Sequence, residues 1–229
     1  MICNKKKIPT FSFDDGNVDD IRLVEIFNRY GLKGTFNLNS AKLTNHPVLW
    51  RFQDKKDVRH INYTDHPDLY NGHEVACHGY THLHFEELDY NTAYNEVFLD
   101  KKLLKALYGY DMLGMAYPYG TFDEQIKKIL NEIGIVYCRT VKSTYKFDMP
   151  EDLLELNPTC HCKYEKINAL ADEFIKSNPE KLQMFYIWGH SYEFVTEEDW
   201  AAFEELCKKL SGRDDIIYCT NIEAINLMK

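Results

Sequence analysis

Short apolar runs alternate with longer amphipathic stretches along most of this chain. Apolar residues recurring every three or four positions predict helices, whereas short apolar runs between turn-forming residues predict buried strands. We expect seven strands, at about 9–13, 33–39, 73–78, 114–118, 135–141, 183–188 and 215–220. We expect six helices, at about 17–31, 86–108, 122–134, 166–177, 197–210 and 221–229. The pattern is therefore one of repeated strand–helix units.

This alternation predicts an α/β fold with mainly parallel strands, because parallel neighbours need a helix-length crossover. Seven units in 229 residues fit either an open doubly wound sheet or a barrel of the TIM type. No G-x-G-x-x-G follows a strand, which disfavours dinucleotide binding. Residues 40–73 show no clear period, and we expect an irregular insertion there within a single domain spanning 1–229.

Composition and charge narrow the classes of partner. Hydrophobic residues make up 45% of the chain, which is enough for a sizeable core. The formal net charge of −9 argues against nucleic acid and against an anionic membrane surface, because both require a basic face. A small polar substrate is compatible with this charge.

The chain shows no apolar run of signal-peptide or membrane-helix length, so we expect it to be cytoplasmic. Seven cysteines, most of them in apolar runs, are typical of buried reduced thiols and agree with that location. Cys160-His161-Cys162 lacks the C-x-x-C spacing of common zinc sites and has no second pair nearby.

Two groups of polar residues that follow predicted strands are candidates for a metal site. Asp14 and Asp15 end the first strand, and Gly16 allows a sharp break there. His78 and His82 follow the third strand at a spacing that places them on one face of a helical turn. Each group alone is more often a turn or a coincidence. Because strand C-termini meet at one edge, two histidines and Asp15 together predict a divalent-metal site with room for water.

Two further strand ends carry weaker signals. His190 follows the sixth strand, where a hydrogen-bonded rim histidine is an equally good interpretation. The fourth strand ends in Ala116-Tyr117-Pro118-Tyr119-Gly120, a turn whose backbone N–H groups could face an oxyanion. Neither signal is specific alone.

Taken together, these motifs resemble the polysaccharide deacetylases of carbohydrate esterase family four, the NodB-homology domain. Ser12-Phe13-Asp14-Asp15-Gly16 resembles the family's T-F-D-D-G. His78-Gly79-Tyr80-Thr81-His82 resembles H-[S/T]-x-x-H. Residues 116–120 resemble R-P-P-Y-G, and Ile187-Trp188-Gly189-His190 resembles the closing apolar run that ends in His. The motifs occur in the family's order between residues 10 and 193.

The resemblance implies a distorted (β/α)7 barrel and a role for each motif residue. It implies that Asp15, His78 and His82 bind the metal. It implies that Asp14 is the general base towards the attacking water, and that His190 protonates the departing amine. It also implies that the backbone N–H of Tyr119 stabilises the oxyanion.

Two positions depart from the family pattern. Ala116 stands where the family has the arginine that supports the catalytic aspartate. Arg139, at the end of the fifth strand, is our candidate replacement. Gly79 stands where the family has Ser or Thr. The family's fourth motif is not recognisable, and His161, near its expected place, has a structural interpretation as well as a substrate-binding one. Candidate substrate contacts are Tyr80, Pro118, Arg139, Trp188 and Tyr192.

The leading hypothesis is a metal-dependent hydrolase that removes an acetyl group from an N- or O-acetylated sugar, oligosaccharide or glycoconjugate. Zn²⁺ is the expected ion, with Co²⁺, Ni²⁺, Mn²⁺ or Fe²⁺ as alternatives. A second hypothesis is hydrolysis of a non-sugar amide or cyclic imide, and a third is a non-catalytic carbohydrate-binding barrel. The sequence leaves the substrate's identity and the oligomeric state open.

Overall fold

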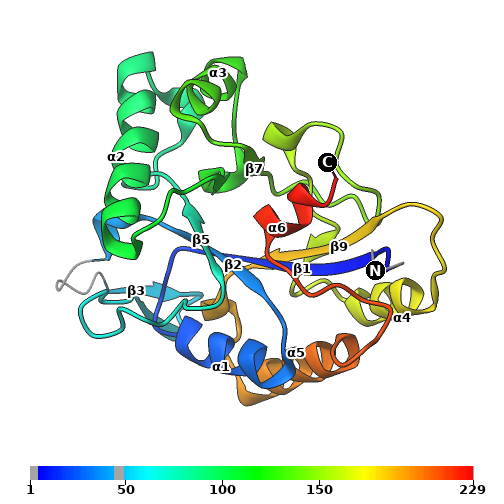
Figure 1. The fold of residues 1–229 in the computed structure, drawn as a ribbon. Helices are drawn as coiled ribbons and strands as arrows, with labels where there is room; N and C mark the ends of the chain where they lie inside the picture. The colour runs from blue at the N-terminus through cyan, green and yellow to red at the C-terminus, as the bar shows by residue number, and fades with distance from the viewer. Residues whose placement is uncertain (1–4, 44–48, 229) are drawn as a thin grey trace.

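A single curled parallel sheet organises the molecule (Figure 1). The computed structural model describes residues 5–43 and 49–228. The strands follow the order β7-β6-β5-β2-β1-β9-β8, and every pair between neighbours is parallel. Their bounds are β1 Lys7–Asp14, β2 Gly34–Leu38, β5 Glu74–Cys77, β6 Gly114–Ala116, β7 Tyr137–Arg139, β8 Cys160–His161 and β9 Gln183–Gly189. The predicted mainly parallel, barrel-like α/β fold is confirmed.

Six α-helices pack against this sheet. They are α1 Asp20–Tyr30, α2 Tyr90–Tyr108, α3 Glu124–Ile133, α4 Ile167–Lys176, α5 Glu197–Leu210 and α6 Asn221–Asn226. Helices α1, α5 and α4 lie along one side in Figure 1, and α2 and α3 lie together at the far end. Where the structure describes the chain, it contains no helix both long and apolar enough to cross a membrane.

The core lies between the sheet and the helices on its convex side. β1 is buried at every position, as expected for a central parallel strand that is covered on both faces. Phe11, Phe13 and Phe27 pack with Phe203 of α5, with ring centroids 4.8–6.3 Å apart. Each buried aromatic side chain contributes about 1.5–3 kcal/mol by leaving water. This apolar layer fixes β1 and therefore the position of the residues that follow it.

The predicted strand at 215–220 is wrong. That segment makes only an isolated bridge, from Ile216 to Lys7, and β8 supplies the seventh strand instead. β2 pairs with β1 from Phe11 onwards, so only the first residues of that edge are open to a further segment. β8 has two residues, too few to produce a recognisable apolar pattern in the sequence.

The segment predicted as an irregular insertion contains an antiparallel hairpin. β3 Leu49–Phe52 pairs with β4 Lys56–Arg59 through a turn in which Gln53 and Asp54 both have positive φ. Residues 44–48 of the predicted insertion lie outside the described residues. The rings of Trp50 and Phe52 pack on Tyr192, 4.7 and 5.1 Å away between centroids. The hairpin therefore covers the segment that follows β9.

Six of the seven cysteines lie within the described residues, and all six are buried and free: Cys77, Cys138, Cys160, Cys162, Cys207 and Cys219. The expectation of buried thiols is confirmed for these six. Cys3 lies outside the described residues.

Candidate metal centre and active site

The chain turns sharply where β1 ends, and this turn separates the two aspartates. Asp14 is the last residue of the strand, whereas Asp15 and Gly16 have φ values of 76° and 60°. A Cβ on Gly16 would lie 2.7 Å from a side-chain carbon of Leu38. The position therefore requires glycine both for its positive φ and for this close contact. A non-glycine residue with positive φ stores strain, which surrounding contacts must hold in place. The two carboxylates can therefore face one site from adjacent positions.

His78 and His82 meet through a loop and not through the helical turn that their spacing suggested. Residues 78–84 contain no helix, and Gly79 and His82 have positive φ values of 76° and 70°. Asn39 donates hydrogen bonds from Nδ2 to the carbonyls of His78 and Gly79, at 2.6 Å each. The helical interpretation of the i, i+4 spacing is wrong, although the two rings do lie together, with centroids 4.8 Å apart.

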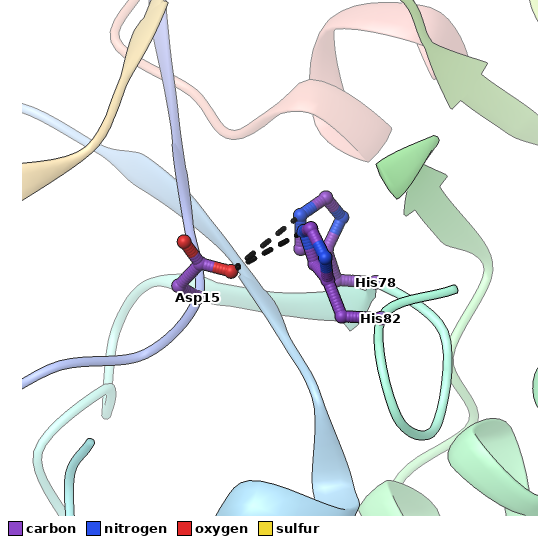
Figure 2. Close-up of side chains that lie close together, drawn as sticks. All are labelled: Asp15, His78 and His82. Carbon is purple, nitrogen blue, oxygen red and sulfur yellow. Dashed lines mark ion pairs between the residues drawn. The ribbon is translucent and has the colours of Figure 1, made fainter. Parts of the chain in front are cut away.

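Asp15, His78 and His82 form a candidate metal centre (Figure 2). The Nε2 atoms of His78 and His82 lie 3.9 and 3.5 Å from Asp15 Oδ1, and the ligand atoms of all three residues lie within 4.8 Å of one another. Asp15 Oδ1 is buried and has no hydrogen-bond partner. An unpartnered buried carboxylate oxygen facing two imidazoles fits a divalent cation, because an isolated buried charge is otherwise costly.

The protonation states of the cluster suit metal binding. His78 Nδ1 lies 2.8 Å from the Ala116 carbonyl, so this nitrogen carries the proton and Nε2 is free to bind. Burial lowers the pKa of His78, and burial is also the main reason why the pKa of His82 falls to about 3. Burial raises the pKa of Asp15, but neighbouring charge, that of His190 foremost, outweighs burial and lowers the pKa to about 2. Neutral imidazoles and an ionised carboxylate are the forms that bind a metal.

Asp14 is held by two side chains from other strands. Asn37 Nδ2 donates to its Oδ1 at 2.8 Å, and the guanidinium of Arg139 forms a buried ion pair with its Oδ2. Burial raises the pKa of Asp14, but the Arg139 charge outweighs this, so the pKa is lowered. Ala116 and Arg139 are paired in β6 and β7, and the small alanine leaves the sheet face open for the longer side chain. An arginine therefore does support Asp14, from the neighbouring strand.

His190 faces the aspartates from the other side of the centre. It follows β9, and its Nε2 lies 3.9 Å from both Asp14 Oδ2 and Asp15 Oδ2. Burial lowers the pKa of His190, but Glu193 and the two aspartates outweigh burial and raise the pKa to about 9. Tyr192 stacks on the His190 ring, with 4.9 Å between centroids, and donates to Asp15 Oδ2 at 3.3 Å. His190 therefore lies beside two carboxylates and has a raised pKa.

Comparison with known proteins identifies the family. Residues 2–138 match the family model for polysaccharide deacetylase. The chain belongs to the polysaccharide deacetylase family. The match includes Asp14, Asp15, His78 and His82 and ends before His190. None of the curated proteins matches the chain.

Solved structures agree with this assignment at the level of the fold. A Mycobacterium smegmatis protein assigned as a polysaccharide deacetylase has a TM-score of 0.67 at 17% identity, covering 100% of this chain and 92% of that one. A family 4 carbohydrate esterase from Streptomyces lividans, solved with acetate, has a TM-score of 0.57 at 17% identity, covering 95% and 92%. A family 4 pseudoenzyme from Bacillus anthracis has a TM-score of 0.59 at 14% identity, covering 97% and 66%. At these identities the likeness shows the fold alone.

In this member of the polysaccharide deacetylase family, Pro118 and Tyr119 lie on the turn after β6. Pro118–Gly120 forms a short 3-10 turn in which Tyr119 has a φ of 58°. The exposed Tyr119 ring stacks on His84, 3.6 Å between centroids, and contacts His82 edge-on at 4.5 Å. The ring of Tyr119, the predicted oxyanion residue, therefore borders His82, one of the candidate metal ligands.

The remaining predicted substrate contacts differ in accessibility. Tyr80 is partly exposed, whereas Tyr192 is only 7% exposed and is covered by the β3–β4 hairpin. Trp188 lies under the Arg139 guanidinium, 4.5 Å from its ring centroid. Tyr80, Pro118, Arg139, Trp188 and Tyr192 as substrate contacts stay predictions. Arg139 is fully buried and forms an ion pair with Asp14, so it holds that carboxylate in place.

Sequence reasoning missed two residues of the site, Asn37 and Glu193. Asn37 lies in β2 directly beside Asp14 in the sheet register. An asparagine among the apolar residues of a buried strand was the available signal, because a buried amide needs a partner. Glu193 lies three residues after His190, and only the local spacing pointed to it.

Proposed function

We propose that this chain is a metal-dependent hydrolase that removes an acetyl group from an N-acetylated sugar, oligosaccharide or glycoconjugate. One observation carries the proposal. Asp15, His78 and His82 converge at a point flanked by the buried carboxylate of Asp14 and by His190, whose Nε2 lies 3.9 Å from both aspartates. Hydrolysis of an amide needs all of these functions, because the amine is a poor leaving group until it is protonated.

Each side chain has one task in this proposal. A divalent ion held by Asp15, His78 and His82 would supply Lewis acidity and lower the pKa of a water molecule. Asp14, kept ionised by Arg139 and oriented by Asn37, accepts a proton from the attacking water. His190 donates a proton from Nε2 to the departing nitrogen. The turn at Tyr119 presents its backbone N–H to the oxyanion.

The acetyl group is favoured by the family and by the neighbours. The Streptomyces lividans esterase of the same fold was solved with acetate. An O-acetyl ester is a close variant, because the same attack by water would serve it. Zn²⁺ is the proposed ion, since two imidazoles and one carboxylate suit it; Co²⁺, Ni²⁺, Mn²⁺ and Fe²⁺ are the alternatives.

Two other functions have weaker support. The missing arginine at Ala116 favoured a non-sugar amide or cyclic imide, but Arg139 now occupies that role from β7. A non-catalytic carbohydrate-binding barrel has a precedent in the Bacillus anthracis pseudoenzyme. The buried Asp14–Arg139 pair and His190 argue against it here, because a binding protein needs neither.

The test is acetate release from a panel of N-acetylated and O-acetylated sugars, with cyclic imides included. Dialysis against a chelator should abolish turnover, and one equivalent of Zn²⁺ should restore it. Asp15→Asn should lose both metal binding and turnover, while the exposed Asp54→Asn serves as the matched control. Activity that survives complete removal of metal would contradict the proposal. Turnover of cyclic imides alone would replace it with the second function.

A further inference from the structure

Glu193 lies beside His190, with its Oε2 atom 3.4 Å from His190 Nδ1. It ends the short 3-10 turn Ser191–Glu193 that follows β9. We propose that Glu193 and His161 form a relay that positions His190, so that its Nε2 points to the leaving nitrogen of the substrate. This inference rests on the proposed function, because it assigns a positioning role within that reaction.

One oxygen of Glu193 gathers the polar contacts. Glu193 Oε2 accepts a hydrogen bond from the backbone N–H of His190 at 3.1 Å. The same oxygen lies 3.0 Å from His161 Nε2 and 3.4 Å from His190 Nδ1. The contact to His190 Nδ1 is an ion pair and not an aligned hydrogen bond, since Nδ1 has no hydrogen-bond partner by geometry. The carboxylate therefore joins β8 to the residue after β9.

The contacts of His161 fix which of its nitrogens carries the proton. His161 Nδ1 lies 3.1 Å from the backbone N–H of Lys163 and must accept from it. The proton therefore resides on Nε2, which donates to Glu193 Oε2. His161 is held in this orientation by the edge-on contact with Trp188, 4.7 Å between centroids. His161 lies in β8, whereas His190 follows β9. The Glu193 carboxylate beside His190 is therefore held by a residue of the neighbouring strand.

The Glu193 charge in turn decides how the His190 ring is turned. With Nδ1 facing Glu193, Nε2 faces Asp14 and Asp15 at 3.9 Å, on the side where the reacting groups meet. A ring flip would place the carbon edge there and leave the carboxylate facing a C–H group. A carboxylate behind a histidine commonly fixes its tautomer and orientation in this way.

The proposed step conserves atoms and charge. Water oxygen forms a bond to the acetyl carbon and its proton passes to Asp14. The C–N bond breaks as His190 Nε2 gives its proton to nitrogen, and the Nδ1 proton stays beside Glu193. The immediate products are acetic acid, which keeps the second water proton, and the free amine. Asp14 is then protonated and His190 neutral, and return of that proton from Asp14 to His190 through solvent restores both groups with no other reactant required.

His161, His190 and Glu193 also have the geometry of a second cation site. Both nitrogens of His161 are already engaged, one with the Lys163 N–H and one with Glu193. Hydrogen bonds therefore account for the cluster without an ion. Metal stoichiometry tests this alternative directly.

The decisive variants are Glu193→Gln and His161→Gln, assayed on two substrates. An N-acetylated sugar needs its nitrogen protonated, whereas 4-nitrophenyl acetate has a leaving group that needs no proton. We expect Glu193→Gln to lower kcat on the amide about 10- to 100-fold with KM nearly unchanged, and to leave the ester rate within about threefold. His161→Gln should follow the same pattern with a smaller loss. Glu198→Gln, an exposed change in the adjoining helix, should alter neither.

Nitrogen-15 NMR of the histidine rings provides a readout that does not depend on turnover. We expect His190 Nδ1 to carry a proton in the wild-type protein and this preference to be lost in Glu193→Gln. One equivalent of Zn²⁺ should bind to both proteins. Equal losses on amide and ester, an unchanged His190 spectrum, or a second Zn²⁺ lost with Glu193 would each overturn the inference. If no acetylated substrate reacts, the proposed function fails, while the spectrum still decides the role of Glu193.

Discussion

Two buried carboxylates on the same face of the sheet behave in opposite ways. Asp14 ends β1, and Glu74 begins β5 near the other end of the sheet. Each is reached by a side chain from β7, Arg139 in the first case and Tyr137 in the second. Burial raises both pKa values, but Arg139 reverses this for Asp14, while the neutral donors around Glu74 leave its pKa raised. The charge of the partner, and not the depth of burial, decides the direction of the pKa shift.

Small residues on β6 allow the side chains of Tyr137 and Arg139 to cross that strand and contact Glu74 and Asp14. A Cβ on Gly114 would lie 2.1 Å from the Tyr137 ring, so glycine is required for Tyr137 to cross. Ala116 stands beside Arg139 in the register and leaves similar room. Glu74 receives Tyr137 OH at 2.8 Å, Thr35 Oγ1 at 2.9 Å and the Ile222 N–H at 3.0 Å. Glu74 is thus surrounded by neutral donors, whereas Asp14 is paired with a cation.

The largest effect is expected when the base itself is neutralised. Asp14→Asn keeps the shape and the hydrogen bond from Asn37 but cannot accept a proton. We expect kcat to fall about 10³-fold, within the range for loss of a general base, while one Zn²⁺ equivalent still binds. Steady-state kinetics and calorimetric metal titration measure the two quantities. Turnover close to that of the wild type would show that Asp14 is not the base.

The next effect comes from removing the cation that distinguishes the two carboxylates. Arg139→Met should raise the pKa of Asp14 and shift the acid limb of the kcat/KM profile to higher pH, because the positive charge that favours the ionised carboxylate is lost. Activity should therefore fall most at low pH. Breaking a buried pair should also lower the free energy of unfolding by about 3–5 kcal/mol.

The sign of the pH dependence of stability follows from the direction of the Asp14 shift. Its folded pKa lies below the unfolded value, so the stability it contributes is present above pH 3.8 and is lost as pH falls through the folded pKa. Denaturation curves from about pH 6 down to about pH 2 should show this loss on acidification in the wild type and not in Arg139→Met. A profile that is identical in both proteins would contradict the assigned partner.

Moving the arginine from β7 to β6 tests whether its position matters. The double variant Ala116→Arg with Arg139→Ala moves the cation to the family position. We expect it to recover most of the kcat/KM that Arg139→Ala loses, to within about threefold of wild type, because one cation beside Asp14 suffices. Recovery would show that β6 and β7 are equivalent sources. No recovery would show that the buried path from β7 is required.

The smallest effect is expected at the structural carboxylate. Glu74→Gln keeps the acceptor for Thr35 and Ile222 and can donate to the Tyr137 hydroxyl, so kcat should stay within about twofold of wild type. The raised pKa of Glu74 means that its protonated form stabilises the fold at low pH and that this contribution is lost as pH rises through the folded pKa. The Tm of the variant should therefore exceed that of wild type at pH 9. A large loss of activity would make Glu74 functional and remove the contrast with Asp14.

Most of the fold could be predicted because its signals are local. Six of the seven predicted strands and all six predicted helices correspond to elements of the structure, with ends shifted by a few residues. The failures were the segment at 215–220, the two-residue β8 and the β3–β4 hairpin. Each depends on which sheet edge or surface is free, and a single segment does not carry that information.

The candidate site divides in the same way. Asp14, Asp15, His78 and His82 were found because each pair is close in sequence and follows a strand. Arg139 was suggested only by its place at a strand end, and Asn37 and Glu193 were missed. Their roles require a partner 23, 125 or 3 residues away to meet them in space. The Asn37 contact joins adjacent strands, and the Arg139 contact spans the three strands between β7 and β1.

The sequence by itself determined the parallel sheet, the strand ends that gather polar residues and the family motifs, because periodicity and short motifs are properties of neighbouring residues. Only the tertiary structure decided that Arg139 reaches Asp14, that Tyr137 reaches Glu74 and that Glu193 links His161 to His190. The physical reason is that these contacts depend on strand order, on register and on the small residues at Gly114 and Ala116. Those features place charges side by side that the chain itself keeps far apart.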